Sequence, residues 1–199
     1  MRYVSTRGGV PPAGFEEVLL AGLAADGGLY VPGAWPRLER DDLEELRGAS
    51  YQEVAARVLA PFVGDALSEA ELRRLVEQAY GAFDHTAVAP LRQLGPSDWL
   101  LELFHGPTLA FKDIALQLLG LLFEHVLARR RQSITIVGAT SGDTGSAAIA
   151  ACAGRERMRV VILHPDRRIS EVQRRQMTTV EAENVHNIAI AGSFDDCQA

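Results

Sequence analysis

The sequence predicts an α/β protein, with a mostly helical N-terminal region followed by part of a parallel-sheet domain. Two observations lead to this prediction. In the first half, apolar residues recur mainly at helical spacing, and two serine–glutamate pairs have the spacing of helix-capping boxes. In the second half, segments rich in apolar and β-branched residues alternate with helical segments, as in βαβ units. We therefore expect two regions, residues 1–97 and residues 98–199.

The first region is predicted to contain several helices and one short strand. Residues 15–25 have helical spacing and run into an Asp-Gly-Gly stop signal at residues 26–28. Residues 29–31 are a candidate strand. Capping boxes at residues 50–53 and 68–71 predict the starts of two further helices. The second of these has one face that we expect to be buried, formed by Leu72, Leu75, Val76 and Ala79.

The second region is predicted to alternate between strands and helices. The expected strands cover residues 99–104, 133–137, 159–163 and 184–190, and the expected helices cover residues 114–130, 145–153 and 169–180. Ser193 is then followed by acidic residues, which is typical of a helix start. A helix that has just begun is an unfavourable place for a protein to end. We therefore expect the chain to be the N-terminal part of a longer protein.

Composition excludes several classes of function. The chain is 47% hydrophobic and 23% charged, which is ordinary for a globular protein. Its net charge of -6 argues against nucleic acid as the main partner. The most apolar run, residues 114–123, is too short to span a membrane, and no signal peptide opens the chain. Two cysteines without a CxxC pair and five dispersed histidines predict a cytoplasmic protein with no metal site.

Lys112 is the only lysine among the 20 basic residues, since all the others are arginines. Arginine stays protonated at any pH that a protein meets, so it cannot offer a lone pair. Lysine can do so once its surroundings lower its pKa from about 10.4. A single lysine in an arginine-rich chain is therefore a candidate for amine chemistry. The alternative is one surface lysine left by chance.

Two glycine-containing motifs follow predicted strands. The first, HGPTLAFKD at residues 105–113, forms a loop from which Lys112 opens a helix, at the end of the sheet where ligands of α/β proteins collect. The second, GATSGDTGS at residues 138–146, would offer free backbone N–H groups and hydroxyls to an anion. An N-capped helix on a tight turn explains the second motif equally well. Asp143 would repel an anion, so we expect its carboxylate to point elsewhere.

Together the two motifs resemble the threonine synthase family, which comprises pyridoxal-phosphate enzymes of the tryptophan-synthase-β fold type, fold type II. Residues 3–8 and 194–199 are also similar to that family, so the resemblance covers the whole chain. Related dehydratases and cysteine synthases have Asn where this chain has Asp143. The acidic residue therefore indicates the threonine synthase branch.

The resemblance implies a role for each matching residue. Lys112 would form the Schiff base with pyridoxal 5′-phosphate and later move protons. Phe111 and Asp143 would also bind the cofactor, Asp143 near its phenolic oxygen. The implied substrate is O-phospho-L-homoserine, which reacts with water to give L-threonine and phosphate. The residues that would hold its carboxylate are Thr140, Ser141, Gly142, Asp143, Thr144 and Gly145.

Some parts of the family pattern are not found in this sequence. The family binds the cofactor phosphate with a later glycine-rich loop, and no such loop follows residue 146. We therefore expect these 199 residues alone to bind the cofactor weakly and to be inactive. A phospho-lyase similar to threonine synthase and a non-catalytic binding module remain alternatives, although the retained lysine argues against the module. The oligomeric state and the roles of Ser5, Thr6 and Arg7 do not follow from the sequence, although Arg7 could contact a phosphate.

Overall fold

The computed structural model describes residues 1–198. They form two compact units, Met1–Gln78 and a second unit that begins at Ala79. The division that the sequence pattern indicates, between residues 97 and 98, stays a prediction about domains.

The first unit is mainly helical, as predicted. Its two short strands pair antiparallel, with Val4 opposite Val31. In chain order its elements are β1 (Tyr3–Ser5), α1 (Phe15–Ala21), β2 (Tyr30–Pro32), α2 (Arg40–Glu45), α3 (Tyr51–Val63), the short 3-10 helix η1 (Gly64–Ala66) and most of α4 (Glu69–Tyr80). Strand β1 and helix α2 were not predicted. The first helix is shorter than predicted, because Gly22 adopts a φ of +69° and ends it after Ala21.

Both predicted capping boxes are confirmed. Glu53 N donates to Ser50 Oγ at 3.2 Å, and Ser50 N donates to Glu53 Oε2 at 2.7 Å. Ser68 and Glu71 make the same two bonds, at 3.3 and 2.8 Å. Each box satisfies two N–H groups that a helix start would otherwise leave without partners. The predicted apolar face of α4 is also buried, with residual exposures of 0–2% at Leu72, Leu75, Val76 and Ala79.

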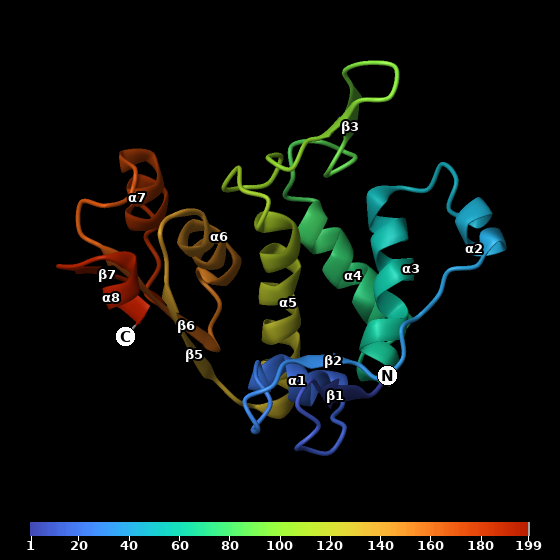
Figure 1. Cartoon of the computed structure of the whole chain (residues 1–199), viewed down its shortest axis with the longest axis horizontal. Coiled ribbons are helices and arrows are strands. Elements are labelled where there is room, and N and C mark those ends of the chain that lie inside the picture. The colour runs from blue at the N-terminus through green and yellow to red at the C-terminus, as the bar shows by residue number, and fades with distance from the viewer. Residues whose placement is uncertain (199) are drawn as a thin grey trace. The chain divides into compact units, whose positions relative to one another are not determined.

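The second unit contains the predicted parallel sheet. Its order is β5-β6-β7, and both pairs of strands are parallel, with Val160 of β6 opposite Ile136 and Val185. Figure 1 shows this sheet beside α6 and α7. In chain order the elements of the unit are β3 (Leu91–Gln93), β4 (Trp99–Leu101), α5 (Asp113–Arg130), β5 (Ile134–Ala139), α6 (Asp143–Cys152), β6 (Met158–Pro165), α7 (Glu171–Thr178), β7 (Val185–Ile190) and α8 (Phe194–Gln198).

Small residues allow α5 and α6 to approach each other closely. A Cβ added to Gly120 of α5 would collide with the main-chain oxygen of Ala151 in α6. Val160 and Ile162 of the central strand β6 are 0% and 2% exposed, so the core of this unit lies around that strand. The alternation of β-branched strands with apolar helices therefore predicted the fold class correctly.

The segment at residues 99–104 differs from its prediction. Only Trp99–Leu101 forms a strand, and it pairs antiparallel with β3 in a separate hairpin. All three of its side chains are exposed, Trp99 by 55%. An apolar run predicts a buried strand only on average, because its sequence does not show whether a neighbouring element covers it.

None of the helices in residues 1–198 is both long enough and apolar enough to cross a membrane.

Candidate functional site

The first motif forms an irregular loop between β4 and α5. Leu109 adopts a φ of +61°, a left-handed conformation that costs energy in a residue with a branched side chain. The turn is closed by Leu109 N, which donates to Gly106 O at 3.1 Å. Lys112 then occupies the N-cap position of α5, half-buried, with its Nζ 4.2 Å from the centre of the Phe111 ring. The loop thus places the only lysine at the start of a helix, with an aromatic face beside its amine.

Asp113 anchors this loop, although the sequence reasoning assigned it no role. Its side chain is 0% exposed. Oδ2 accepts from Thr108 N and Oδ1 accepts from Thr108 Oγ1, both at 2.8 Å. A Cβ on Gly106 would collide with Asp113, so this position requires glycine. The carboxylate therefore fixes the loop immediately before Lys112, and its place in the first turn of α5 suits the positive end of the helix dipole.

The second motif connects β5 to α6 and is organised around the buried hydroxyl of Thr140. Its Oγ1 accepts from Gly142 N at 3.0 Å and from Gly145 N at 2.9 Å. Ser146 Oγ donates to Gly142 O at 3.2 Å. Gly142 has a φ of +149°, which residues with a side chain rarely adopt. The hydroxyls of Thr140 and Ser146 thus bond within the loop, and a direct contact of Thr140 with substrate stays a prediction.

Three backbone N–H groups of this loop are left open. Within residues 1–198, the N–H groups of Ser141, Asp143 and Thr144 have no hydrogen-bond partner. All three residues are exposed, and the last two begin α6. Unpaired N–H groups at a helix start form a site for an anion, because the donors and the helix dipole act together. The loop could therefore receive a negatively charged group such as a carboxylate, and this role stays a prediction.

Helix α7 contacts both motif loops. Gln173 Nε2 donates to Asp143 Oδ1 in the second loop. Gln176 Nε2 donates to the main-chain oxygen of Thr108 in the first loop, at 3.0 Å. The two loops predicted from sequence are therefore brought to the same end of the sheet. The Asp143 carboxylate thus has a partner in α7, and its direction away from the anion site stays a prediction.

A histidine at the start of the first motif is held between two carboxylates. His105 Nδ1 lies 2.8 Å from Asp84 Oδ1, and Nε2 lies 2.9 Å from Glu102 Oε2. The hydrogen bond with Glu102, together with the Asp84 carboxylate, raises the pKa of His105 against the opposing effect of desolvation. The positively charged form of the ring is thereby favoured. Sequence alone gave no signal for this cluster, because Asp84 lies 21 residues before His105.

The polar residues near the N-terminus form a separate cluster in the first unit. Ser5 Oγ donates to Asp26 Oδ1 at 2.8 Å, and Arg7 Nη1 donates to Asp26 O at 3.0 Å. Thr6 Oγ1 accepts from Leu29 N at 3.0 Å. Several hydrogen bonds lower the pKa of Asp26, and the one from Gly28 N has the largest effect. In this structure these side chains stabilise the loops around Asp26.

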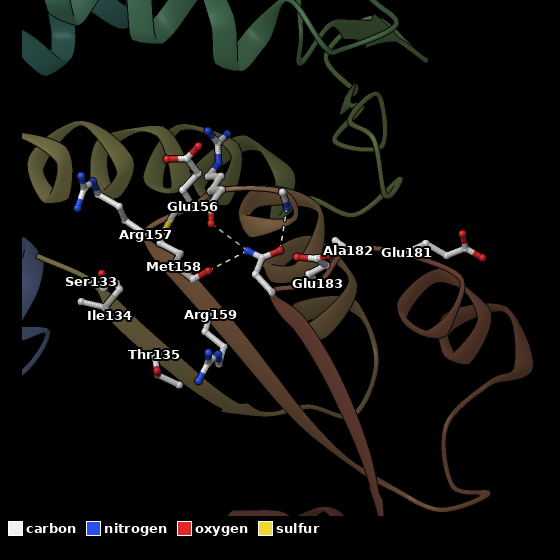
Figure 2. Close-up of a pocket in the computed structure, with 13 residues that line it drawn as sticks. Ser133, Ile134, Thr135, Glu156, Arg157, Met158, Arg159, Glu181, Ala182 and Glu183 are labelled. Atoms are coloured by element: carbon white, nitrogen blue, oxygen red, sulfur yellow. Dashed lines mark hydrogen bonds between the residues drawn. The ribbon is translucent and has the colours of Figure 1, made fainter.

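A cavity of about 680 Å³ lies elsewhere in the second unit, at the amino ends of the parallel strands (Figure 2). Its lining includes Ser133 and Ile134 at the start of β5, and Arg157 and Met158 at the start of β6. The second motif loop lies at the opposite end of β5, after its last residue. None of the residues predicted for the site lines this cavity. The candidate site therefore rests on the loops and not on this cavity.

Comparisons with known proteins agree with these motifs. Residues 2–80 match the family model described as threonine synthase N terminus, and residues 83–199 match the one described as pyridoxal-phosphate dependent enzyme. The chain is 58% identical to the threonine synthase of Pseudomonas aeruginosa, over 100% of this chain and 42% of the relative. It is 47% identical to the threonine synthase of Schizosaccharomyces pombe, over 98% of this chain and 40% of the relative.

Solved structures give the same result. A threonine synthase from Brucella melitensis with pyridoxal phosphate bound superposes with a TM-score of 0.96 at 55% identity, and the match covers 100% of this chain and 43% of that one. The yeast threonine synthase has a TM-score of 0.93 at 42% identity, over 99% of this chain and 42% of that one. The chain thus spans well under half the length of the relatives it matches.

Proposed function

We infer, from the premise that this chain belongs to the family of pyridoxal-phosphate-dependent enzymes, that the protein acts as a threonine synthase. The proposed reaction converts O-phospho-L-homoserine and water into L-threonine and phosphate. The observation that carries the proposal is the pairing of two loops through α7, one with the only lysine and the other with three open N–H donors. The match to threonine synthases across the whole chain supports the assignment of substrate.

The residues present fit the cofactor on two grounds. Lys112 supplies a half-buried amine at the start of α5, and no other lysine side chain in the sequence could take its place. The second loop offers open N–H donors next to that position along the same end of the sheet. When bound, pyridoxal phosphate supplies an electron sink for the carbon chemistry, while the protein supplies binding, orientation and proton transfer.

We assign the residues as follows. Lys112 Nζ holds the cofactor through its aldehyde and later carries protons as a general base and acid. Phe111 lies against the lysine and restricts the space around the amine. Asp143, whose carboxylate accepts a hydrogen bond from Gln173, would lie near the cofactor's phenolic oxygen. The substrate carboxylate is held by the second loop, that is by Thr140, Ser141, Gly142, Asp143, Thr144 and Gly145.

The setting of the protein follows from the same assignment. We propose that it works in the cytoplasm on a small-molecule substrate, without nucleic acid or membrane as a partner. The net charge of -6 supports the first exclusion, since a phosphate backbone requires a basic surface.

The decisive experiment uses the protein expressed from its complete gene. Borohydride reduction in the presence of pyridoxal phosphate should attach the cofactor covalently to the peptide that contains Lys112. Incubation with O-phospho-L-homoserine should release phosphate and L-threonine in equal amounts. Lys112→Ala should lose both the cofactor absorbance and the activity, and Lys112→Arg, which keeps the charge but has no free lone pair, should behave in the same way.

Two other outcomes would replace the proposal. Phosphate release without threonine would identify a phospho-lyase in place of a threonine synthase. A cofactor spectrum that is unchanged in Lys112→Ala would indicate a binding module without this chemistry.

A further inference from the structure

We propose that helix α7 is a brace, that is, a helix that fixes the position of the two motif loops relative to each other, with Gln173 and Gln176 as its positioning residues. These two side chains occupy positions i and i+3 of α7, so they project from the same face of the helix. One donates to the second loop and the other to the first. The inference deepens the proposed function and rests on it for the identity of the ligand.

The contact of Gln173 with the second loop is specific in shape as well as in hydrogen bonding. A Cβ on Gly142 would collide with the Gln173 side chain, so the amide lies directly over the glycine. The same amide donates to the Asp143 carboxylate. Gln173 is itself held at the start of the helix, where its N–H donates to the N-cap Ser170 Oγ at 3.2 Å. The helix start therefore fixes the position of Gln173, and the hydrogen bond from Gln173 in turn restrains the Asp143 carboxylate.

Met177 makes the attachment of α7 to the second loop rigid. Its side chain is 0% exposed. A Cβ on Gly145 would lie 2.6 Å from Met177 Sδ, so the thioether packs directly on the loop backbone. Buried packing of this kind fixes the helix, because displacing it would open a cavity in the core. The hydrogen bonds of the two glutamines therefore come from a helix whose position on the second loop is fixed by packing.

The contact of Gln176 continues into the anchor of the first loop. Thr108 accepts from Gln176 through its carbonyl and donates to Asp113 through both its N–H and its hydroxyl. Thr108 is thus held from both sides, by α7 and by the start of α5. The loop ends at Lys112, so the brace sets the amine relative to the open N–H donors of the second loop. Efficient catalysis requires that the reactive amine and the N–H donors that bind the substrate anion keep a fixed distance and orientation.

Hydrogen–deuterium exchange on the cofactor-free protein from the complete gene tests the brace directly. Gln173→Ala should accelerate exchange in peptides that cover residues 140–146 by roughly tenfold or more, as expected when one hydrogen bond to a charged group is lost. Gln176→Ala should accelerate exchange in residues 106–112 and leave the second loop nearly unchanged. The matched control is Val172→Ala, on the same helix at a side chain that is 69% exposed, and it should change neither loop.

This separation of effects distinguishes positioning from a general loss of helix stability, because unfolding of α7 would accelerate exchange in both loops at once. Equal acceleration of both loops by each single variant would overturn the proposal, and so would unchanged exchange in the Gln173→Ala/Gln176→Ala double variant.

A second measurement ties the brace to the cofactor. Gln173→Glu keeps the size of the side chain but replaces the amide donor with a carboxylate beside Asp143. We expect it to raise the dissociation constant for pyridoxal phosphate by about tenfold and to shift the pH at which the cofactor absorbance changes, whereas Val172→Ala should do neither. A normal dissociation constant and pH profile in Gln173→Glu would contradict the positioning role. If the unmodified protein binds no pyridoxal phosphate, the proposed function fails, and the exchange experiment still decides on the brace.

Discussion

Removal of the Asp113 carboxylate should loosen the loop before Lys112. In Asp113→Ala the N–H and the hydroxyl of Thr108 both lose their acceptor, and the two bonds concerned are 2.8 Å long. The N–H is the more sensitive group, because a main-chain donor cannot turn toward another partner as a hydroxyl can. The first turn of α5 also loses its acidic residue, which stabilises the positive end of the helix.

The expected loss of stability follows from these two bonds. A hydrogen bond to a charged group contributes about 1.5–3 kcal/mol. Two such bonds set an upper range of about 3–6 kcal/mol, but Thr108 is only half-buried and water can replace part of what is lost. We therefore expect Asp113→Ala to lower the free energy of unfolding by about 3 kcal/mol. Asp113→Asn should cost about 1 kcal/mol, because its oxygen can accept from the N–H while its amide donates to the hydroxyl.

Urea unfolding of the protein from the complete gene, followed by circular dichroism, measures both variants. Thr108→Val separates the two bonds, since it removes the hydroxyl but leaves the main-chain donor in place. In a double-mutant cycle with Asp113→Ala, the coupling energy between the two side chains should be about 1–2 kcal/mol. A loss below about 1 kcal/mol in Asp113→Ala would refute the anchoring role. An equal loss in the Ala and Asn variants would show that the negative charge of the carboxylate stabilises the loop, because Asn keeps the volume of the side chain and can still bond Thr108.

Three further predictions concern other parts of the second unit. Gly145→Ala should cost about 1–3 kcal/mol of unfolding free energy, because the new methyl would lie 2.6 Å from Met177 Sδ; a neutral result in urea would show that the methionine can move away. The pKa of His105 is raised in the folded protein, mainly by Glu102, so its stabilisation should be present below the ordinary pKa of about 6.5 and be lost as the pH rises through the folded-state pKa. Thermal unfolding should therefore show a deficit in His105→Gln that is largest at low pH and shrinks as the pH rises, and a deficit that grows with pH would contradict this sign. Asn184→Ala should cost about 2–3 kcal/mol, because this amide bonds three main-chain carbonyls and one N–H beside the cavity of Figure 2, yet exchange in residues 140–146 should not change.

Sequence patterns predicted the features that depend on local interactions. The capping boxes at Ser50 and Ser68 were correct because each is complete within four residues of chain. The parallel sheet was correct because its strands and helices alternate at a regular spacing. The pairing of β3 with β4 in a hairpin was not predicted, since the strands are three residues each and all their side chains are exposed. Apolar composition alone does not determine whether such a segment is covered by its neighbours.

The candidate site shows the same limit. Its two loops were found because glycines, hydroxyls and a single lysine stand next to each other in the sequence. The residues that hold the loops were not found, because their partners are distant in the chain. Gln173 lies 30 residues from Asp143, and Gln176 lies 68 residues from Thr108. A half-buried glutamine in a helix gives no sign of such a contact in the sequence, so only the tertiary structure identifies it.

The acidic residue in the second loop can now be reconciled with an anion site. An unpaired carboxylate beside three open N–H donors would oppose the binding of a substrate carboxylate, since like charges a few ångströms apart repel. The Gln173 amide donates to the Asp143 carboxylate, fixes its direction and lies over Gly142. The N–H groups of Ser141, Asp143 and Thr144 meanwhile remain open. The main chain of the loop can therefore receive an anion while its one acidic side chain is held by α7.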